Sequence, residues 1–203
     1  MQTLAIFVSG GGTNCENIIR YFQGSASVRV GLVVSSSASA YALVRAARLG
    51  VPSVVLSRAE LDDPVRMLGV LDSYGIDFIV LAGYLRVIPD FLLAAYPRRI
   101  VNIHPSLLPK YGGKGMYGAH VHAAVKAAGD PESGITIHYV DARVDGGEIL
   151  FQARTPLSPD DTPEDIAARV HRLEMEHYPR VIEAVIAGKE SPAETGTAPP
   201  IPS

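Results

Sequence analysis

The chain has one cysteine, Cys15, among its 203 residues. A disulfide within the chain and a cysteine-rich zinc site are therefore both excluded. It also lacks any apolar run of membrane-spanning length, and Met1 to Leu4 lack the basic segment that opens a signal peptide. These absences predict a cytoplasmic protein.

A strong charge of either sign is absent as well. The formal net charge of −3 gives no general attraction to nucleic acid or to an anionic membrane surface. We therefore expect neither nucleic acid nor a membrane as a partner, which leaves small-molecule substrates. The sequence alone does not decide between a monomer or homodimer. Any anionic ligand has to be bound by local geometry and not by the overall field.

The first half of the chain alternates short apolar runs with helical segments. The expected strands cover residues 4–8, 28–34, 53–56, 78–81 and 100–104, and the expected helices cover 16–23, 40–49, 62–74 and 89–96. This alternation predicts an α/β fold, single-domain and Rossmann-like, with a mainly parallel twisted sheet and helices on both faces.

After His104 the pattern changes to a glycine-rich segment, a helix over 119–128, and two strands over 134–140 and 149–155 that predict an antiparallel excursion. A long helix is expected from Thr162 to about Ala187, with a kink or break near Tyr178 because of Pro179. We expect one domain over residues 1–188 and a loose tail over residues 189–203.

The segment Val101–Pro109 predicts a buried strand that delivers two polar side chains into a rigid turn. Asn102 and His104 are two residues apart, so they point to the same side of a strand. Pro105 and Pro109 restrict the backbone that follows. A carboxamide and an imidazole held side by side can polarise one oxygen atom, which indicates acyl-transfer or carbonyl chemistry.

A glycine loop, Ser9–Asn14, lies between the first expected strand and the first expected helix. Its exposed amides and the helix dipole suit a phosphate, and Thr13 and Asn14 can add side-chain donors. It is not the dinucleotide fingerprint, because Cys15 stands where that motif needs Gly or Ala. A tight turn without a ligand is the alternative.

Asp145 lies in a Val-Asp-Gly-Gly loop that can place its carboxylate inside a cleft. Beside an imidazole this carboxylate would favour the charged ring. The alternative is an aspartate that caps its own turn. His120 and His122 lack an obvious third ligand, so no metal site is expected. His138 is expected in the core, and His171 and His177 at the surface or in packing.

Four motifs together resemble one family: Ser9–Asn14, Leu81–Arg86, Asn102–Pro109 and Asp145–Gly147. In this order, over about residues 3–187, they resemble the phosphoribosylglycinamide formyltransferases, folate-dependent enzymes of purine synthesis. The resemblance implies the Rossmann-like formyltransferase fold. It also implies transfer of the formyl group of 10-formyltetrahydrofolate to the amine of 5'-phosphoribosylglycinamide, with no metal.

The resemblance implies a role for each matching residue. The catalytic group would be Asn102, His104 and Asp145. The phosphoribosylglycinamide site would contain Gly12, Thr13, Asn14 and Glu174. The folate site would contain Arg58, Leu85, Arg86, Val87, Ile88, Asn102, Asp141 and Val144. One departure is Lys110–Gly118, which is longer than the common form of this loop.

Other functions stay open at this point. A methionyl-tRNA formyltransferase would need a further C-terminal domain and a basic surface, and a formyltetrahydrofolate deformylase usually carries an N-terminal regulatory domain. A third alternative is a non-catalytic, Rossmann-type nucleotide-binding domain. It would bind phosphate without needing Asn102, His104 and Asp145 together.

Overall fold

The computed structural model describes residues 1–189. The chain divides into two compact units, which we call the first and the second unit. The first comprises Met1–Asn102 and Tyr139–Ala142, and the second comprises Ile103–His138 and the chain from Arg143 onward. The predicted tail falls outside the described residues from 190 on, and a single domain over 1–188 stays a prediction.

The strands join in a sheet of order β3-β2-β1-β4-β5-β6-β7. They are β1 (Gln2–Val8), β2 (Val28–Ser35), β3 (Ser53–Val55), β4 (Phe78–Leu81), β5 (Ile100–His104), β6 (Glu132–Tyr139) and β7 (Ile149–Pro156). The pairs among β1 to β5 are parallel, and β6 pairs with β7 antiparallel. This confirms the predicted α/β class, the mainly parallel sheet and the antiparallel excursion.

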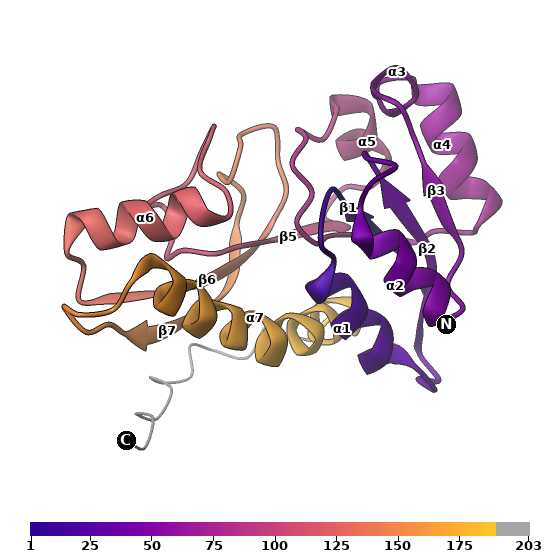
Figure 1. Ribbon diagram of the computed structural model, residues 1–203. Helices are drawn as coiled ribbons and strands as arrows, with labels where there is room; N and C mark the ends of the chain where they lie inside the picture. Colours follow the sequence, from indigo (N-terminus) through magenta and orange to yellow (C-terminus); the bar gives the residue numbers. More distant parts are fainter. Residues whose placement is uncertain (190–203) are drawn as a thin grey trace. The chain divides into compact units, whose positions relative to one another are not determined.

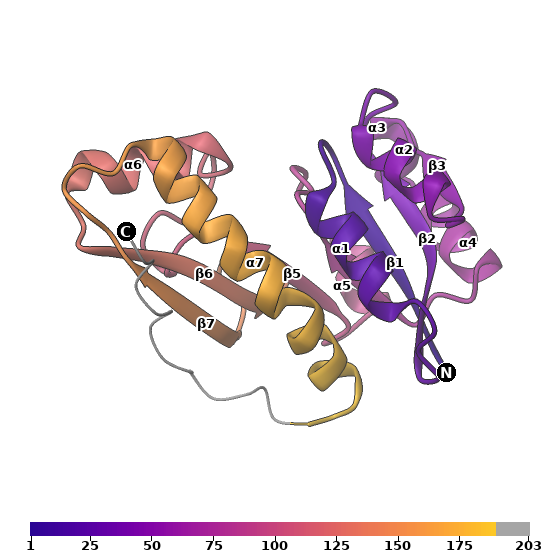
Figure 2. The ribbon, with the colours of Figure 1, turned by 60° about the horizontal axis from the view of Figure 1, so that its bottom comes forward.

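The helices are α1 (Thr13–Phe22), α2 (Tyr41–Arg48), α3 (Arg58–Leu61), α4 (Pro64–Ser73), α5 (Asp90–Ala95), α6 (Ala119–Ala128) and α7 (Pro163–Ile186). In the first unit, α1 and α2 cover one face of the strands and α4 and α5 the other (Figures 1 and 2). The expected helix from Asp62 begins instead at Pro64. Asp63 caps it by accepting from the N–H groups of Val65 and Arg66.

The core of the first unit explains why β1 reads as a continuous apolar run. Leu4 to Val8 are fully buried, because both faces of a parallel strand are covered by helices. Residues from β1, β2, β4 and the helices α4 and α5 form one apolar cluster, which includes Phe7, Leu71 and Leu92. This rigid core fixes the ends of the strands, where the loops that carry polar groups begin.

In the second unit, α7 lies along β6 and β7 with α6 beside its N-terminal half (Figure 2). Of the kink or break predicted near Tyr178, the break is wrong, because α7 is one helix that contains Pro179, and the kink stays a prediction. A proline removes one backbone donor, which costs about 3 kcal/mol in a helix interior. Tyr178, Val181 and Ile182 are fully or almost fully buried around it, so side-chain packing offsets that loss.

Cys15 lies on the buried face of α1. Its side chain is buried, and burial raises the pKa of its thiol to about 12. The thiolate is the reactive form, and at pH 8 only about one thiol in ten thousand would carry the charge. We therefore expect iodoacetamide at pH 8 to leave the folded protein unmodified and to alkylate Cys15 after unfolding in guanidinium, as read by intact mass. Rapid alkylation of the folded protein would contradict this packing.

Candidate functional site

The glycine loop of the first unit connects β1 to α1. The helix begins at Thr13, three residues earlier than expected, so Thr13 and Asn14 belong to its first turn. Gly12 stands at the N-cap with a left-handed backbone (φ 76°), and no side chain caps the helix. A Cβ on Gly12 would lie 2.4 Å from the Cβ of Ala42, so the loop approaches α2 as closely as only glycine allows.

Backbone donors of this loop are available for a ligand. Within residues 1–189, the N–H groups of Gly11 and Gly12 meet no hydrogen-bond acceptor. They adjoin the first turn of α1, whose N–H groups have no partners within the helix and carry the positive end of its dipole. Loop and helix start therefore present backbone donors and the positive end of a helix dipole side by side, which suits an anionic ligand.

The residues that the resemblance assigns to folate differ in their exposure. Leu85 and Val87 expose 59% and 70% of their surface, which is unusual for large apolar side chains, whereas Ile88 is buried in the core. The N–H of Leu85 donates to Ser9 Oγ at 3.0 Å, which ties this segment to the glycine loop. Arg58 is exposed at the start of α3 and lies 3.8 Å from Asp62.

The remaining assigned residues are divided between the two units. Arg86 and Asp141 belong to the first unit and Val144 to the second, where Val144 is 49% exposed. Asn102 and His104 are alternate residues of β5, as the sequence predicts, and Asn102 pairs in register with Leu81 of β4. Asn102 is half-buried, and His104 is buried.

His104 is held in one orientation in the second unit. Its Nε2 lies 2.7 Å from the backbone oxygen of Tyr111, in the segment that the sequence identifies as unusually long. A carbonyl oxygen can only accept, so Nε2 carries a hydrogen and donates it. Tyr111 has a left-handed backbone (φ 56°), a conformation that is uncommon for a residue with a side chain. The other ring nitrogen, Nδ1, is thereby turned toward Asp145.

The carboxylate of Asp145 faces Nδ1 of His104. Its Oδ2 lies 3.6 Å from His104 Nδ1 and accepts a 2.9 Å hydrogen bond from the N–H of Gly113. The separation from the ring exceeds a hydrogen bond but lies within ion-pair range once the ring is protonated. Because Nε2 already donates to Tyr111, a proton on Nδ1 gives both ring nitrogens complementary partners. The arrangement therefore directs Nε2 of His104 to a carbonyl oxygen and Nδ1 to a carboxylate oxygen.

His138 is a further member of this cluster, and the sequence prediction for it was incomplete. It is buried at the end of β6, as expected of a core residue, but its Nε2 lies 3.8 Å from Asp145 Oδ1. Asp145 thus stands between two imidazoles, one on each carboxylate oxygen. Its left-handed backbone (φ 54°) is held in a turn in which the N–H of Gly146 donates to the oxygen of Arg143.

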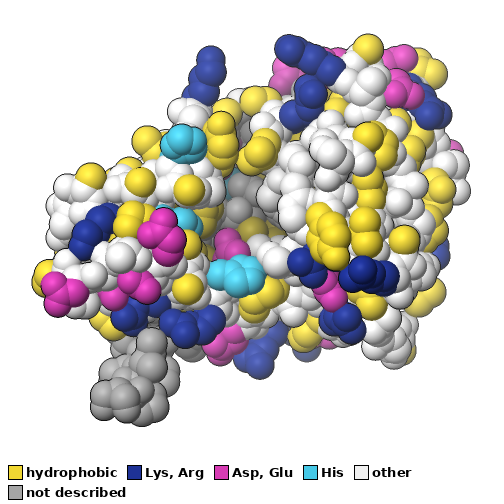
Figure 3. Space-filling model, viewed as in Figure 1, with side chains coloured by type: hydrophobic (Ala, Val, Ile, Leu, Met, Phe, Trp, Pro, Cys, Tyr) yellow, Lys and Arg dark blue, Asp and Glu magenta, His cyan; other side chains and the backbone are white. Residues whose placement is uncertain are grey.

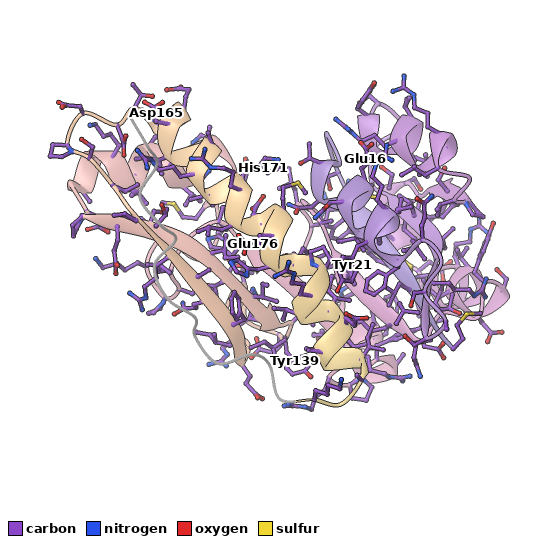
Figure 4. All side chains as sticks on the ribbon, turned by 90° about the horizontal axis from the view of Figure 1, so that it is seen from below. Glu16, Tyr21, Tyr139, Asp165, His171 and Glu176 are labelled. Atoms are coloured by element: carbon purple, nitrogen blue, oxygen red, sulfur yellow. The ribbon has the colours of Figure 1, made fainter. Side chains whose placement is uncertain are left out.

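Glu174 lies on α7 in the second unit, with a mostly buried side chain. It accepts a 3.1 Å hydrogen bond from Nδ1 of His171, which raises the pKa of that histidine. Its charge also raises the pKa of His122, although burial outweighs it and lowers that pKa overall. His171 is therefore the partner of an assigned substrate residue and not merely a surface group; it is labelled in Figure 4.

Within the described residues, no group of three His, Cys, Asp or Glu side chains is placed to hold a metal ion, and no helix is long and apolar enough to cross a membrane. His120 packs edge-on against the ring of Tyr117, at 5.4 Å between ring centroids. Ser106, two residues after His104, donates to the backbone oxygen of Lys110 and closes the turn after β5.

Comparison with known proteins identifies formyl transferases as relatives of this chain. The family model described as formyl transferase matches residues 2–182. A phosphoribosylglycinamide formyltransferase of Haemophilus influenzae is 38% identical over 93% of this chain and 89% of its own length. A chloroplastic phosphoribosylglycinamide formyltransferase of Arabidopsis thaliana is 42% identical over 91% of this chain, which spans 65% of that relative.

A solved structure from the same family has the same fold. The crystal structure of glycinamide ribonucleotide transformylase 1 from Symbiobacterium toebii superposes with a TM-score of 0.84 at 35% identity. The match covers 93% of this chain and 89% of that one.

Proposed function

This chain belongs to the formyl transferase family, and within it to the phosphoribosylglycinamide formyltransferases, and we propose that it transfers the formyl group of 10-formyltetrahydrofolate to the amine of 5'-phosphoribosylglycinamide. The products are formylglycinamide ribonucleotide and tetrahydrofolate. The observation that carries the proposal is the cluster of His104 and Asp145 in the second unit, 3.6 Å apart.

His104 stabilises the oxyanion that forms when the amine attacks the formyl carbon. Its Nε2 hydrogen now points to the carbonyl oxygen of Tyr111, 2.7 Å away. In the reaction the oxyanion takes the place of this carbonyl as the acceptor. The Asn102 amide, on the same side of β5, is the second donor. One such donor contributes about 100- to 1000-fold to the rate.

Asp145 keeps His104 charged and passes a proton from the attacking amine toward N10 of the leaving folate. Its second oxygen faces His138, which supports the carboxylate from the other side. A covalent intermediate with the enzyme is not needed. Cys15 is fully buried and Ser106 closes a turn, so neither serves as a nucleophile.

The glycine loop is the proposed site of the ribose phosphate, with Gly12, Thr13 and Asn14 as its donors. The N–H groups of Gly11 and Gly12, which have no acceptor among residues 1–189, support this role. Glu174 is proposed to contact the glycinamide part of the same substrate. Binding of the phosphate fixes the amine in position. The reaction then loses less entropy in bringing the two substrates together, which lowers its barrier.

The folate is the formyl donor, and its ring system is flat and partly apolar. The exposed side chains of Leu85 and Val87 suit such a ring. Arg58, Arg86, Asp141 and Val144 are proposed as further contacts, and Ile88 contributes from the core by supporting the segment. A cytoplasmic location and a monomer or homodimer are proposed alongside.

An assay that follows loss of the 10-formyl group tests the proposal, run with and without phosphoribosylglycinamide. Turnover that requires the amine is expected. Equal turnover in water alone would indicate a deformylase, and transfer to methionyl-tRNA would indicate the tRNA enzyme. Phosphate binding without any turnover would indicate a nucleotide-binding domain. Each of these three results would overturn the proposal.

Gly12→Val tests the phosphate loop. Valine cannot adopt φ 76° without strain, and its Cβ would collide with Ala42, so the loop has to move away from α2. We expect the KM for phosphoribosylglycinamide to rise about 100-fold while the KM for the folate changes little. Gly10→Ala is the matched control, because a Cβ on Gly10 meets nothing within 4 Å. Equal rises in both KM values would contradict the assignment.

A further inference from the structure

Arg45 of α2 is hydrogen-bonded to the backbone of the glycine loop. Its Nε donates to the backbone oxygen of Gly11 at 2.9 Å, although the two residues lie 34 positions apart in sequence. The neighbouring N–H of Ala42 donates to the oxygen of Gly10 at 3.1 Å. Two consecutive carbonyl groups of the loop are therefore directed toward α2.

The direction of these carbonyls sets the direction of the amides. In a trans peptide, C=O and N–H point to opposite sides of the chain. The Gly10 carbonyl shares its peptide with the N–H of Gly11, and the Gly11 carbonyl shares its peptide with the N–H of Gly12. Both N–H groups consequently point away from α2, and both are without an acceptor in the part of the chain described.

Arg45 is itself fixed on three sides. Besides the Gly11 oxygen, its Nη1 bonds to the Glu16 carboxylate, and its guanidinium lies over the Tyr41 ring at 5.0 Å from the centroid. Its side chain is only 27% exposed. Basic and hydrophobic side chains lie side by side over this part of the first unit (Figure 3).

Glu16 adds an electrostatic reason for an arginine here. It lies in the first turn of α1 (Figure 4), next to the loop that is to receive a phosphate. Arg20 also bonds to it at 2.8 Å, and the bonds from Arg20 and Arg45 hold the pKa of Glu16 below its ordinary value. Because Glu16 neutralises the charge of Arg45, we expect Arg45 to stabilise the loop and not to bind the phosphate itself.

We propose that Arg45 is a positioning residue of the phosphate site: it fixes the Gly11–Gly12 peptide so that the amide N–H of Gly12 faces the phosphate of the amine substrate. This inference rests on the proposed function, since it assigns the loop to that phosphate. It adds a residue that lies outside the loop and outside the residues that the family resemblance supplies.

The test compares Arg45→Met with Arg48→Met. Arg48 lies on the same helix over the same Tyr41 ring, at 5.9 Å, and has no bond to the loop. We expect Arg45→Met to raise the KM for phosphoribosylglycinamide about tenfold or more, with kcat and the KM for the folate within about twofold. Arg48→Met should leave all three unchanged. An unchanged KM in Arg45→Met would overturn the inference.

Two further variants separate positioning from charge. Arg45→Lys keeps the charge but loses the planar group that donates to Gly11 and Glu16 at once, so its KM should resemble that of Arg45→Met. In Arg45→Met/Glu16→Gln the unmatched carboxylate is gone, and the KM should stay high. A wild-type KM in either variant would show that Arg45 only neutralises charge, and would overturn the positioning role.

Inorganic phosphate provides a readout that does not depend on turnover. Calorimetry should show wild-type protein binding phosphate about tenfold more tightly than Arg45→Met, and Arg48→Met binding like wild type. If wild type binds phosphate but transfers no formyl group, the proposed function fails while the role of Arg45 is still measured. Equal affinity of wild type and Arg45→Met would contradict that role alone.

Discussion

Replacing His104 with alanine is expected to lower kcat for formyl transfer by about 1000-fold or more. The ring supplies the donor to the oxyanion and the positive charge that Asp145 stabilises, so its removal takes away both. The KM values should change little, because the ring is proposed to act on the oxyanion and not to bind the phosphate or the folate. Steady-state kinetics with both substrates measures the effect.

A matched control is His177→Gln on α7. His177 packs against the ring of Phe151, at 5.0 Å between centroids, and has no place in the proposed chemistry. Its kcat should remain near that of wild type. A His104→Ala variant that folds by circular dichroism and keeps more than about a tenth of wild-type kcat would remove His104 from the mechanism.

Asp145→Asn is expected to lower kcat by about 100- to 1000-fold. Asparagine keeps the size of the side chain and an oxygen that can accept from the N–H of Gly113. The negative charge between His104 and His138 is lost, so neither the imidazolium nor the passing proton is stabilised. Rates with saturating substrates, together with both KM values, show the loss in kcat.

Asp160→Asn is the control for this substitution. Asp160 also lies in the second unit, in an exposed turn where its N–H donates to Ser158. It should behave as wild type. A near-normal rate for folded Asp145→Asn would mean that the carboxylate only caps its own turn, which was the alternative left open by the sequence.

Local patterns in the sequence predicted the elements that matter most. The continuous apolar runs of β1 and β4 mark strands that are buried on both faces, and the spacing of Asn102 and His104 places them on one side of β5. The glycines after Asp145 predicted a sharp loop, and the structure brings its carboxylate to 3.6 Å from the ring of His104.

Features that depend on distant residues could not be predicted in this way. The start of α1 was misplaced because Gly12 caps it by close approach to Ala42, without the Ser, Thr or Asp that marks most helix starts. Pro179 was expected to kink or break α7, but the helix is unbroken and its neighbours Tyr178, Val181 and Ile182 are buried. His138 and Arg45 contact partners 7 and 34 residues away in sequence, and no local pattern reveals such contacts.

The central claim is that His104 and Asp145 act as one unit on one reaction, and the kcat of the double variant His104→Ala/Asp145→Asn tests it most directly. When two residues act as a unit, replacing either one removes most of their joint contribution to kcat, so replacing both costs little more. The double variant should be no more than about threefold slower than the slower single variant. Losses that multiply, so that the double variant falls by the product of the two single effects, would show that the two residues act independently and would contradict the claim.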